Sequence, residues 1–346
     1  MTAAVAERVE ALWAAATAGD EYAATGLAAD ALDAGLPMET LLLDVVAAVQ
    51  ARVGHEWAAN RISVAQEHTA TAVNERVLAS LAHRSSRQID RAMGRIMVAC
   101  IDGEWHAFPA RLLAEVLRVR GWQVDYLGAQ VPTPHLVAHL HLTNPDAVAL
   151  SSSLAIRLPA AHAAITACQA AGTPVVVGGA AFGPGGRYAR LLGADAWAPD
   201  ARAAADLLAA GPLPRRTPSG DEPRRLADRE YTELTRSAGD LVRGLVADLT
   251  RPGQPPGWTA EHLASLVDYL RAALYVDDPE LFTSFVGWMT GVLTARDVAE
   301  PEVPAALDAL ADRVAGFPRA LRVLARARRP RVSPARDSRT YGGQRT

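Results

Sequence analysis

A short loop after one apolar run contains residue types that bind metals. The run from Ile96 to Ile101 has the composition of a buried strand, and Glu104 and His106 follow it within five residues. A carboxylate that holds one ring nitrogen of a histidine orients the ring and makes it more basic, which leaves the other nitrogen for a transition metal. The pattern suits His106 to coordinate a metal, with Glu104, or alternatively Asp102, holding its ring; an ordinary surface pair of an acid and a histidine is the other interpretation of these residues.

A second group of polar and aromatic residues precedes this loop in the chain. Glu67 and His68 follow Trp57 after nine intervening residues. The stretch from Ser63 to Gln66 has the form of a helix capping box, so we expect a helix to begin there, with Glu67 and His68 in its first turns. Trp57 is expected near the end of the preceding helix, and the three side chains can therefore converge on one pocket.

The hydrophobic pattern divides the chain into parts that position these groups. Residues 1–90 repeat apolar positions every three to four residues, which predicts a helical bundle. Residues 91–212 alternate short apolar strands with helices, which predicts an α/β doubly wound domain of the Rossmann or flavodoxin type. Ligands of such parallel sheets bind beyond the carboxyl ends of the strands, where the loop after Ile101 lies. The predicted strands are 95–101, 122–127, 147–150 and 174–177, and the predicted helices between them are 110–120, 134–142 and 159–171.

The part of the chain after the α/β domain is predicted to be helical. Residues 213–226 are rich in proline and charge, which predicts a linker. Residues 227–329 are predicted to form an all-α domain, with Thr259 and Asp278 as helix caps. Residues 330–346 are polar and rich in arginine, which predicts a disordered tail. The predicted C-terminal helices are 228–249, 259–275, 279–296 and 304–314.

Composition and charge exclude several classes of protein. The chain has 346 residues, of which 50% are hydrophobic, so it can bury the cores of several domains. A net charge of −3 and the lack of a basic recognition helix lead us to expect no direct DNA binding. Cys100 and Cys168 lie in apolar segments, which favours a reducing compartment. Charges within Met1 to Glu10 argue against a signal peptide, and no apolar run suits a membrane span, so we expect a cytoplasmic protein.

The α/β domain resembles a known cobalamin-binding fold. The signature of that fold is an acid-x-His-x-x-Gly loop, a later Ser-x-Leu and then Gly-Gly. The loop from Glu104 to Pro109 matches the first element, with Pro109 in the place of the usual glycine. Ser152-Ser-Leu154 and Gly178-Gly179 match the other two elements in the same order.

This resemblance implies a cofactor whose own base leaves cobalt, so that the protein supplies the lower ligand. His106 would be that ligand, and the dimethylbenzimidazole tail of the cofactor would enter a channel beside the sheet. Ser152 and Leu154 would line the channel, and Gly178 and Gly179 would let the backbone approach the tail closely.

The group formed by Trp57, Glu67 and His68 resembles the cap of the CarH-type adenosylcobalamin photoreceptors. By this resemblance the indole covers the adenosyl group, and the acid and the histidine contact it. Methyl-transfer modules such as methionine synthase have an apolar cap, so the resemblance selects the adenosyl form. Ala58 stands where those photoreceptors have a histidine that binds cobalt after photolysis, which leaves His55, His68 or water as the upper ligand.

The C-terminal helices resemble globin-like sensor domains of bacterial signalling proteins. The whole architecture thereby resembles the photocobilins, which join adenosylcobalamin to a biliverdin-binding globin-like domain. Neither cysteine lies in this region, so a bilin would be bound noncovalently, and a haem bound by His262 has no further support. The resemblance assigns bilin contacts to five side chains that could equally form a helix core and an interface: Tyr269, Arg271, Tyr275, Phe282 and Trp288.

Together these resemblances predict a light-sensing signalling protein rather than an enzyme. Light would break the cobalt–carbon bond of bound adenosylcobalamin and release the cap, and the C-terminal helices, homo-oligomer contacts and an unknown downstream protein would carry the signal. CarH-type proteins also have an N-terminal winged-helix DNA-binding domain, and none fits before the bundle, which adds to the expectation of no direct DNA binding. The alternatives are a corrinoid shuttle for a methyltransferase and a cobalamin-responsive regulator that does not use light. A cobalamin mutase would need a barrel of roughly 250 residues, which does not fit.

Overall fold

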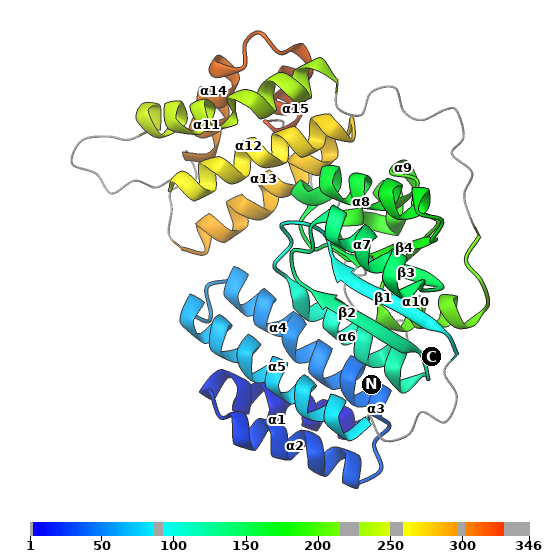
Figure 1. Cartoon of the computed structure of the whole chain (residues 1–346). Coiled ribbons are helices and arrows are strands. Elements are labelled where there is room, and N and C mark those ends of the chain that lie inside the picture. The colour runs from blue at the N-terminus through cyan, green and yellow to red at the C-terminus, as the bar shows by residue number, and fades with distance from the viewer. Residues whose placement is uncertain (1–2, 86–92, 215–227, 250–258, 297–301, 329–346) are drawn as a thin grey trace. The chain divides into compact units, whose positions relative to one another are not determined.

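The computed structural model describes residues 3–85, 93–214, 228–249, 259–296 and 302–328 (Figure 1). The chain forms two compact units, of which the first comprises residues 1–228 together with 289–299 and the second comprises 229–288 and 300–346. Most of the predicted linker 213–226 and the whole predicted tail 330–346 lie outside the described residues. None of the described helices is both long and apolar enough to cross a membrane.

The first unit begins with a bundle of helices, as the apolar spacing predicts. Leu42, Val46 and Val77 are among the branched residues that the helices bury against one another. The predicted capping box is confirmed, because the Ser63 hydroxyl accepts a hydrogen bond from the backbone N–H of Gln66 and the Gln66 side chain accepts one from that of Ser63. The bundle consists of α1 (Ala3–Ala18), α2 (Glu21–Asp33), a continuous helix made of α3 (Met38–Thr40), the π-helical segment η1 (Leu41–Val46) and α4 (Ala47–Ala58), and α5 (Val64–Ser85).

A five-stranded parallel sheet follows the bundle. Its spatial order, β2-β1-β3-β4-β5, is that of a doubly wound fold, so the Rossmann-like prediction is confirmed. All of β3 and nearly all of β1 are buried, as expected of parallel strands that are covered on both faces. The strands are β1 (Arg95–Cys100), β2 (Gln123–Gly128), β3 (Ala147–Ser151), β4 (Val175–Gly178) and β5 (Ala196–Ala198).

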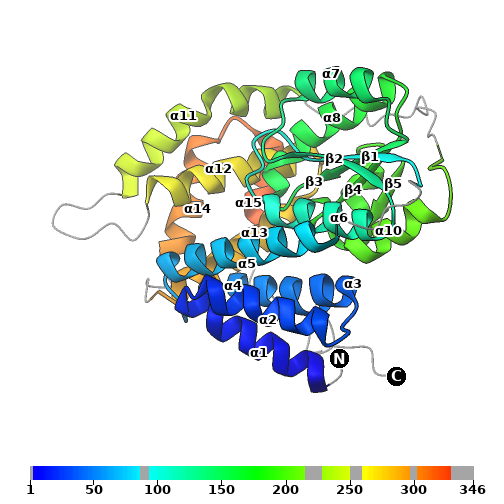
Figure 2. The same ribbon diagram turned by 60° about the horizontal axis from the view of Figure 1, so that its bottom comes forward.

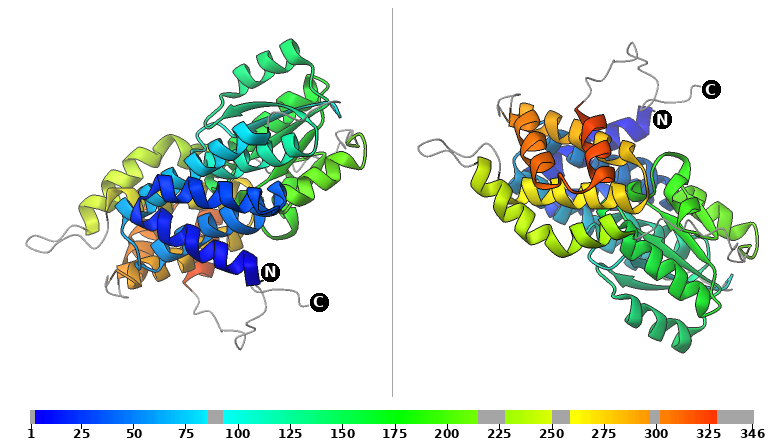
Figure 3. Two further views of the ribbon diagram at one scale, coloured as in Figure 1. Left: turned by 90° about the horizontal axis from the view of Figure 1, so that it is seen from below. Right: turned by 90° about the horizontal axis from the view of Figure 1, so that it is seen from above.

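Helices cover both faces of this sheet. Helices α6 (Ala107–Val119) and α10 (Ala201–Ala209) lie on one face, and α7 (Thr133–Thr143) and α8 (Leu158–Ala170) lie on the other (Figure 2). The bundle packs on the first face, where α3 and α5 contact α6 (Figure 3). A single hydrophobic core therefore extends from the bundle into the sheet domain.

The strand order brings two loops together at the carboxyl edge of the sheet. β1 and β3 are hydrogen-bonded neighbours, although β2 lies between them in the chain. Their onward connections leave toward opposite faces, which makes a crevice at this point of the edge. The loop after β1 begins at Ile101 and the loop after β3 begins at Ser152, so the predicted site residues of both loops meet here.

The observed elements differ from the predicted ones in instructive places. Helix α6 begins at Ala107, before the predicted start, because Pro109 is tolerated in the first turn of a helix. The prediction missed β5, which has three residues and no alternating pattern. It also missed α9 (Arg187–Leu191) and α10, although Asp200 caps α10 by accepting a hydrogen bond from the backbone N–H of Ala203 at 2.8 Å.

The second unit is built of helices, and its predicted caps are confirmed. The Thr259 hydroxyl accepts from the backbone N–H of His262, and the Asp278 carboxylate accepts from that of Glu280. The prediction missed the last helix, because Pro318 follows the preceding helix closely and reads as a breaker. A globin-like arrangement stays a prediction. The described helices are α11 (Arg229–Leu249), α12 (Ala260–Tyr275), α13 (Pro279–Thr294, whose residues 289–294 belong to the first unit), α14 (Glu302–Arg313) and α15 (Pro318–Ala327).

Candidate functional site

Glu104 is a fully buried carboxylate that joins two loops at the edge of the sheet. Its Oε1 accepts a hydrogen bond from the backbone N–H of His106 at 2.9 Å and lies 2.6 Å from ring Nδ1 of His106. Its Oε2 accepts from the Ser152 hydroxyl at 3.0 Å. The same oxygen accepts from the backbone N–H groups of Ser153 and Leu154 at 2.7 and 3.0 Å. The carboxylate therefore ties the loop after β1 to the loop after β3.

These contacts set the protonation of both members of the pair. Burial raises the pKa of Glu104, but hydrogen bonds from the His106 ring and from the backbone of His106, Leu154 and Ser153 outweigh burial and hold the pKa at about 2. The hydrogen bond to Glu104 raises the pKa of His106, against the opposing effect of burial. Because Nδ1 is engaged, the ring presents Nε2, and 55% of the side chain is exposed. Of the two acids that the sequence left open, Glu104 is the one that holds the ring.

The loops after β3 and β4 approach each other so closely that one position excludes a side chain. Gly179 has a φ of 101°, and a Cβ built on it would lie 2.2 Å from the carbonyl oxygen of Ser152. The backbone N–H of Ser152 donates to the carbonyl of Gly178 at 3.1 Å. The glycine pair therefore allows the backbones of the two loops to touch.

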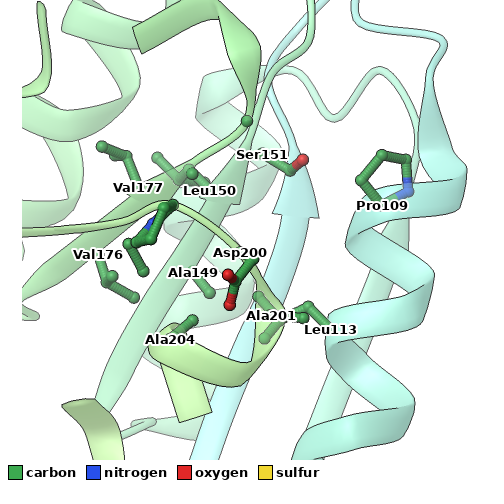
Figure 4. Close-up of a pocket in the computed structure, with 14 residues that line it drawn as sticks. Pro109, Leu113, Ala149, Leu150, Ser151, Val176, Val177, Asp200, Ala201 and Ala204 are labelled. Atoms are coloured by element: carbon green, nitrogen blue, oxygen red, sulfur yellow. The ribbon is translucent and has the colours of Figure 1, made fainter. Parts of the chain in front are cut away.

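A cavity of about 110 Å³ lies beside these loops, between the sheet and helices α6 and α10 (Figure 4). Leu113 projects into it from α6, and Ala201 and Ala204 face it from α10. The walls are mostly apolar, and the residues from β3 and β4 are small or branched. This lining is of the apolar kind that contacts the rings of bound ligands.

The predicted channel residues take two different positions around this cavity. Gly178 and Gly179 line it. Ser152 and Leu154 do not belong to its lining, because their donor groups face Glu104. Their observed contact is with the carboxylate that orients His106.

Trp57, Glu67 and His68 lie at the adjoining ends of α4 and α5. Trp57 occupies the last turn of α4 and packs against the bundle core. Glu67 Oε2 lies 2.6 Å from Nδ1 of His68, whose side chain is 75% exposed. The negative charge of Glu67 also contributes to the raised pKa of His106. That the bundle acid and the sheet histidine share one site stays a prediction.

A chain of hydrogen bonds inside the bundle fixes the position of the Glu67 carboxylate. The Thr71 hydroxyl donates to Glu67 Oε1 at 3.1 Å, and the Gln50 side-chain amide donates to the Thr71 hydroxyl at 2.9 Å. The side-chain amide of Asn74, which is fully buried, donates to Gln50 at 2.8 Å. These residues were not predicted from the sequence, although Glu67, Thr71 and Asn74 have the spacing of one helix face.

An arginine stacks on the predicted cap indole. The guanidinium carbon of Arg296 lies 4.9 Å from the centroid of the Trp57 ring, and its Nη2 donates to the Trp57 carbonyl oxygen at 3.0 Å. Residues 289–299 belong to the same compact unit as α4. A cation that was not predicted from the sequence therefore holds the indole on one side.

The five predicted bilin-binding residues are mainly part of helix packing in the second unit. Phe282 is fully buried, Tyr275 is 7% exposed, and the ring of Tyr269 stacks on Phe285. Arg271 donates to Asp268 at 2.7 Å and to the hydroxyl of Thr235 at 3.1 Å. Trp288 is the exposed residue of the five. Biliverdin binding stays a prediction.

The single oriented imidazole at the edge of the sheet suits a metal that is already coordinated by a macrocycle. No group of three or more His, Cys, Asp or Glu side chains that could hold a bare ion occurs among the described residues. A corrin supplies the equatorial ligands of its own cobalt, so one oriented imidazole is sufficient on the protein side. The cavity beside Gly179 has the apolar lining that a displaced heterocyclic base would contact. The residues present therefore fit a corrinoid whose tail is separated from the metal.

Comparison with known families and relatives agrees with this fit. Residues 94–208 match a B12 binding domain family, and residues 8–82 match a second family with the same description. The chain is 34% identical over 148 residues to the HTH-type transcriptional repressor CarA of Myxococcus xanthus and 32% identical over 163 residues to the HTH-type transcriptional repressor CarH of the same organism. These matches cover 37% and 44% of this chain. They cover 48% of CarA and 52% of CarH, so the chain spans about half the length of these curated relatives.

A solved structure shares the fold of the first unit. The structure of the Methanosarcina barkeri monomethylamine corrinoid protein is 20% identical to this chain, with a TM-score of 0.51. The match covers 59% of this chain and 97% of the corrinoid protein. At this identity the likeness shows a common fold of bundle and sheet.

The expectation of no direct DNA binding is wrong. Both curated relatives are HTH-type transcriptional repressors, which overturns the inference from net charge and from the missing recognition helix. The physical reason is that DNA is bound by a local positive surface, whose charge is lost in an average over a chain of several domains.

Proposed function

Because the chain carries two B12-binding domains and is similar to CarA and CarH, we propose that it is a light-responsive regulator that binds adenosylcobalamin between its bundle and its sheet. The observation that carries this proposal is the His106 ring, which the buried Glu104 carboxylate orients and whose pKa the bundle acid Glu67 helps to raise. In this proposal the chain acts as a sensor and not as an enzyme.

Each side of the site has a distinct task in this proposal. His106 gives Nε2 to cobalt from the sheet side, and the base of the nucleotide tail occupies the cavity beside Gly178 and Gly179. Trp57 covers the adenosyl group, and Glu67 contacts it. Adenosylcobalamin supplies a weak cobalt–carbon bond that visible light breaks. Without that group the indole and the acid would lack the ligand that they hold, and the ends of α4 and α5 would be free to rearrange.

Illumination of the loaded protein tests this function. We expect the dark complex with adenosylcobalamin to change its visible absorption spectrum and its hydrodynamic size when it is illuminated. A complex with cyanocobalamin, which has no adenosyl group, serves as the control and should keep its size. An adenosylcobalamin complex whose spectrum and size are the same before and after illumination contradicts the proposal.

A Trp57→Ala variant should lose its selectivity for the adenosyl form. Stacking of an adenine base on an aromatic ring contributes about 1–3 kcal/mol, so the affinity for adenosylcobalamin should fall by about 5- to 150-fold. The affinity for methylcobalamin should change little, because a methyl group does not reach the indole. Dissociation constants measured in darkness for both cofactors give the selectivity.

The Trp13→Ala variant is a matched control for this substitution. Trp13 is also a half-buried indole of the bundle, and the guanidinium of Arg52 lies 4.3 Å from its ring centroid. Each variant thus loses an indole ring that is in contact with an arginine guanidinium, but only Trp57 lies at the proposed site. Equal selectivity in Trp57→Ala and wild type would count against the cap.

A corrinoid shuttle for a methyltransferase is the principal alternative. It predicts tighter binding of methylcobalamin than of adenosylcobalamin and no dependence on light. Biliverdin binding by α11–α15 is a separate prediction, and an absorption spectrum of the protein mixed with biliverdin tests it. A red-shifted bilin band that survives gel filtration would support it.

A further inference from the structure

Arg157 is a cation without a partner at the edge of the proposed site. It is the last residue of the short 3-10 helix η2 (Ala155–Arg157), which follows Leu154 directly. Its Nε is fully buried and has no hydrogen-bond partner. Within the described parts of the chain, the rest of its guanidinium has no hydrogen bond or ion pair either. A guanidinium stays protonated in proteins and carries five N–H donors. The Arg157 guanidinium can therefore donate hydrogen bonds to an acceptor that the described chain does not supply.

The position of the guanidinium is fixed by Gly103. A Cβ built on Gly103 would lie 2.7 Å from Nη1 and 2.8 Å from Cζ of Arg157, so the cation rests directly on the backbone of this glycine. Gly103 has a φ of 75° and directly precedes Glu104. The guanidinium therefore lies against the loop that carries His106, at the carboxyl ends of β1 and β3.

The acids near this loop do not neutralise the charge of Arg157. Both oxygens of Glu104 are used by His106 and by the loop after β3. Asp102 is exposed and forms no ion pair with Arg157 in the described structure. The site consequently has an uncompensated positive charge where a ligand would lie.

We propose that Arg157 binds the phosphodiester of the cofactor and thereby selects corrinoids that carry a nucleotide loop. The inference rests on the proposed corrinoid binding. The phosphodiester is the one anionic group on the periphery of cobalamin, since the other side chains are neutral amides. It joins the corrin to the nucleotide, so with cobalt above His106 and the base in the cavity beside Gly179, it must cross the edge between them. Arginine suits this task, because its planar fork can give two charge-assisted hydrogen bonds to one phosphate.

Three corrinoids separate this contact from other contacts. Cobalamin has the phosphate and the base, cobinamide phosphate has only the phosphate, and cobinamide has neither. In the Arg157→Gln variant the affinities for cobalamin and for cobinamide phosphate should fall by about 10- to 100-fold, as expected for loss of a hydrogen bond to a charged group. The affinity for cobinamide should not change. Arg157→Lys should recover part of the loss, because it keeps the charge without the fork.

The dissociation constants are measured by absorption titration in darkness on the full chain, with circular dichroism to establish that each variant is folded. Arg84→Gln is the control, since it removes the same charge from the far end of α5, where Arg84 forms an exposed ion pair with Asp33. If the affinity of Arg157→Gln for cobinamide falls as much as its affinity for cobalamin, the guanidinium contacts the corrin amides and the proposal is overturned. Unchanged cobalamin affinity in Arg157→Gln also overturns it. A wild-type chain that binds none of the three corrinoids refutes the proposed function itself, which is a different result.

Discussion

A His106→Ala variant should bind adenosylcobalamin more than about 100-fold more weakly than the wild type. Loss of a group that merely orients a metal ligand already costs about 10- to 100-fold in affinity, and here the ligand itself is removed. The tail cavity and the cap stay in place, so residual binding should come without the spectral change that accompanies imidazole coordination. Absorption titration in darkness measures both the affinity and the spectrum.

The pH dependence of this affinity identifies the histidine. Cobalt binds the neutral ring, and the hydrogen bond to Glu104 raises the pKa of His106 in the free protein above its usual value of 6.5. Protons therefore compete with cobalt below this raised pKa, and the affinity should be constant above it and fall as the pH drops through it. The His106→Ala variant should not show this fall. In Glu104→Gln the ring loses its partner, so the fall should begin at a lower pH, and the plateau affinity should be about 10- to 100-fold weaker.

His135→Ala is the matched control for the ligand assignment. His135 is an exposed residue of α7, on the sheet face opposite to α6, and its removal should leave both the affinity and the pH profile unchanged. If His106→Ala binds the cofactor with wild-type affinity and the same pH profile, His106 is not the ligand.

The sequence was sufficient to locate the Glu104 and His106 pair because the relevant information is local. Glu104 and His106 are separated by one residue in a loop that follows a strongly apolar strand. Their hydrogen bond forms within that loop. The helix start at Ser63 was predictable for the same reason, since a capping box is a contact between residues three apart. Strong local patterns of this kind also placed β1, β3 and β4 within one residue.

The partners of these residues were not predictable, because they depend on packing between distant segments. Ser153 and Leu154 reach Glu104 through backbone N–H groups, which have no signature in the side-chain sequence. Gln50 reaches Thr71 from another helix of the bundle. Arg296 reaches Trp57 from a part of the chain 239 residues away. Only the folded chain shows which of many compatible donors is in position.

A Gly179→Ala variant should lower the free energy of unfolding by about 2–6 kcal/mol. A non-glycine residue at a φ of 101° is strained by about 1–3 kcal/mol, and the new Cβ would lie 2.2 Å from the Ser152 carbonyl oxygen, which adds an overpacking cost of about 1–3 kcal/mol. The clash is with backbone, so it can be relieved only if the loops after β3 and β4 move apart. Denaturant unfolding of the apoprotein measures the loss.

The Gly172→Ala variant separates the clash from the strain of the backbone. Gly172 has a φ of 85°, similar to that of Gly179, but a Cβ built on it would have no heavy atom within 4 Å. It should therefore lose only the strain component, about 1–3 kcal/mol, and bind cobalamin as the wild type does. Gly179→Ala should in addition bind cobalamin more weakly, because the movement that relieves the clash displaces Ser152 from Glu104 and frees the His106 ring. If both variants lose the same stability and neither loses affinity, the close approach of these two loops does not support the site.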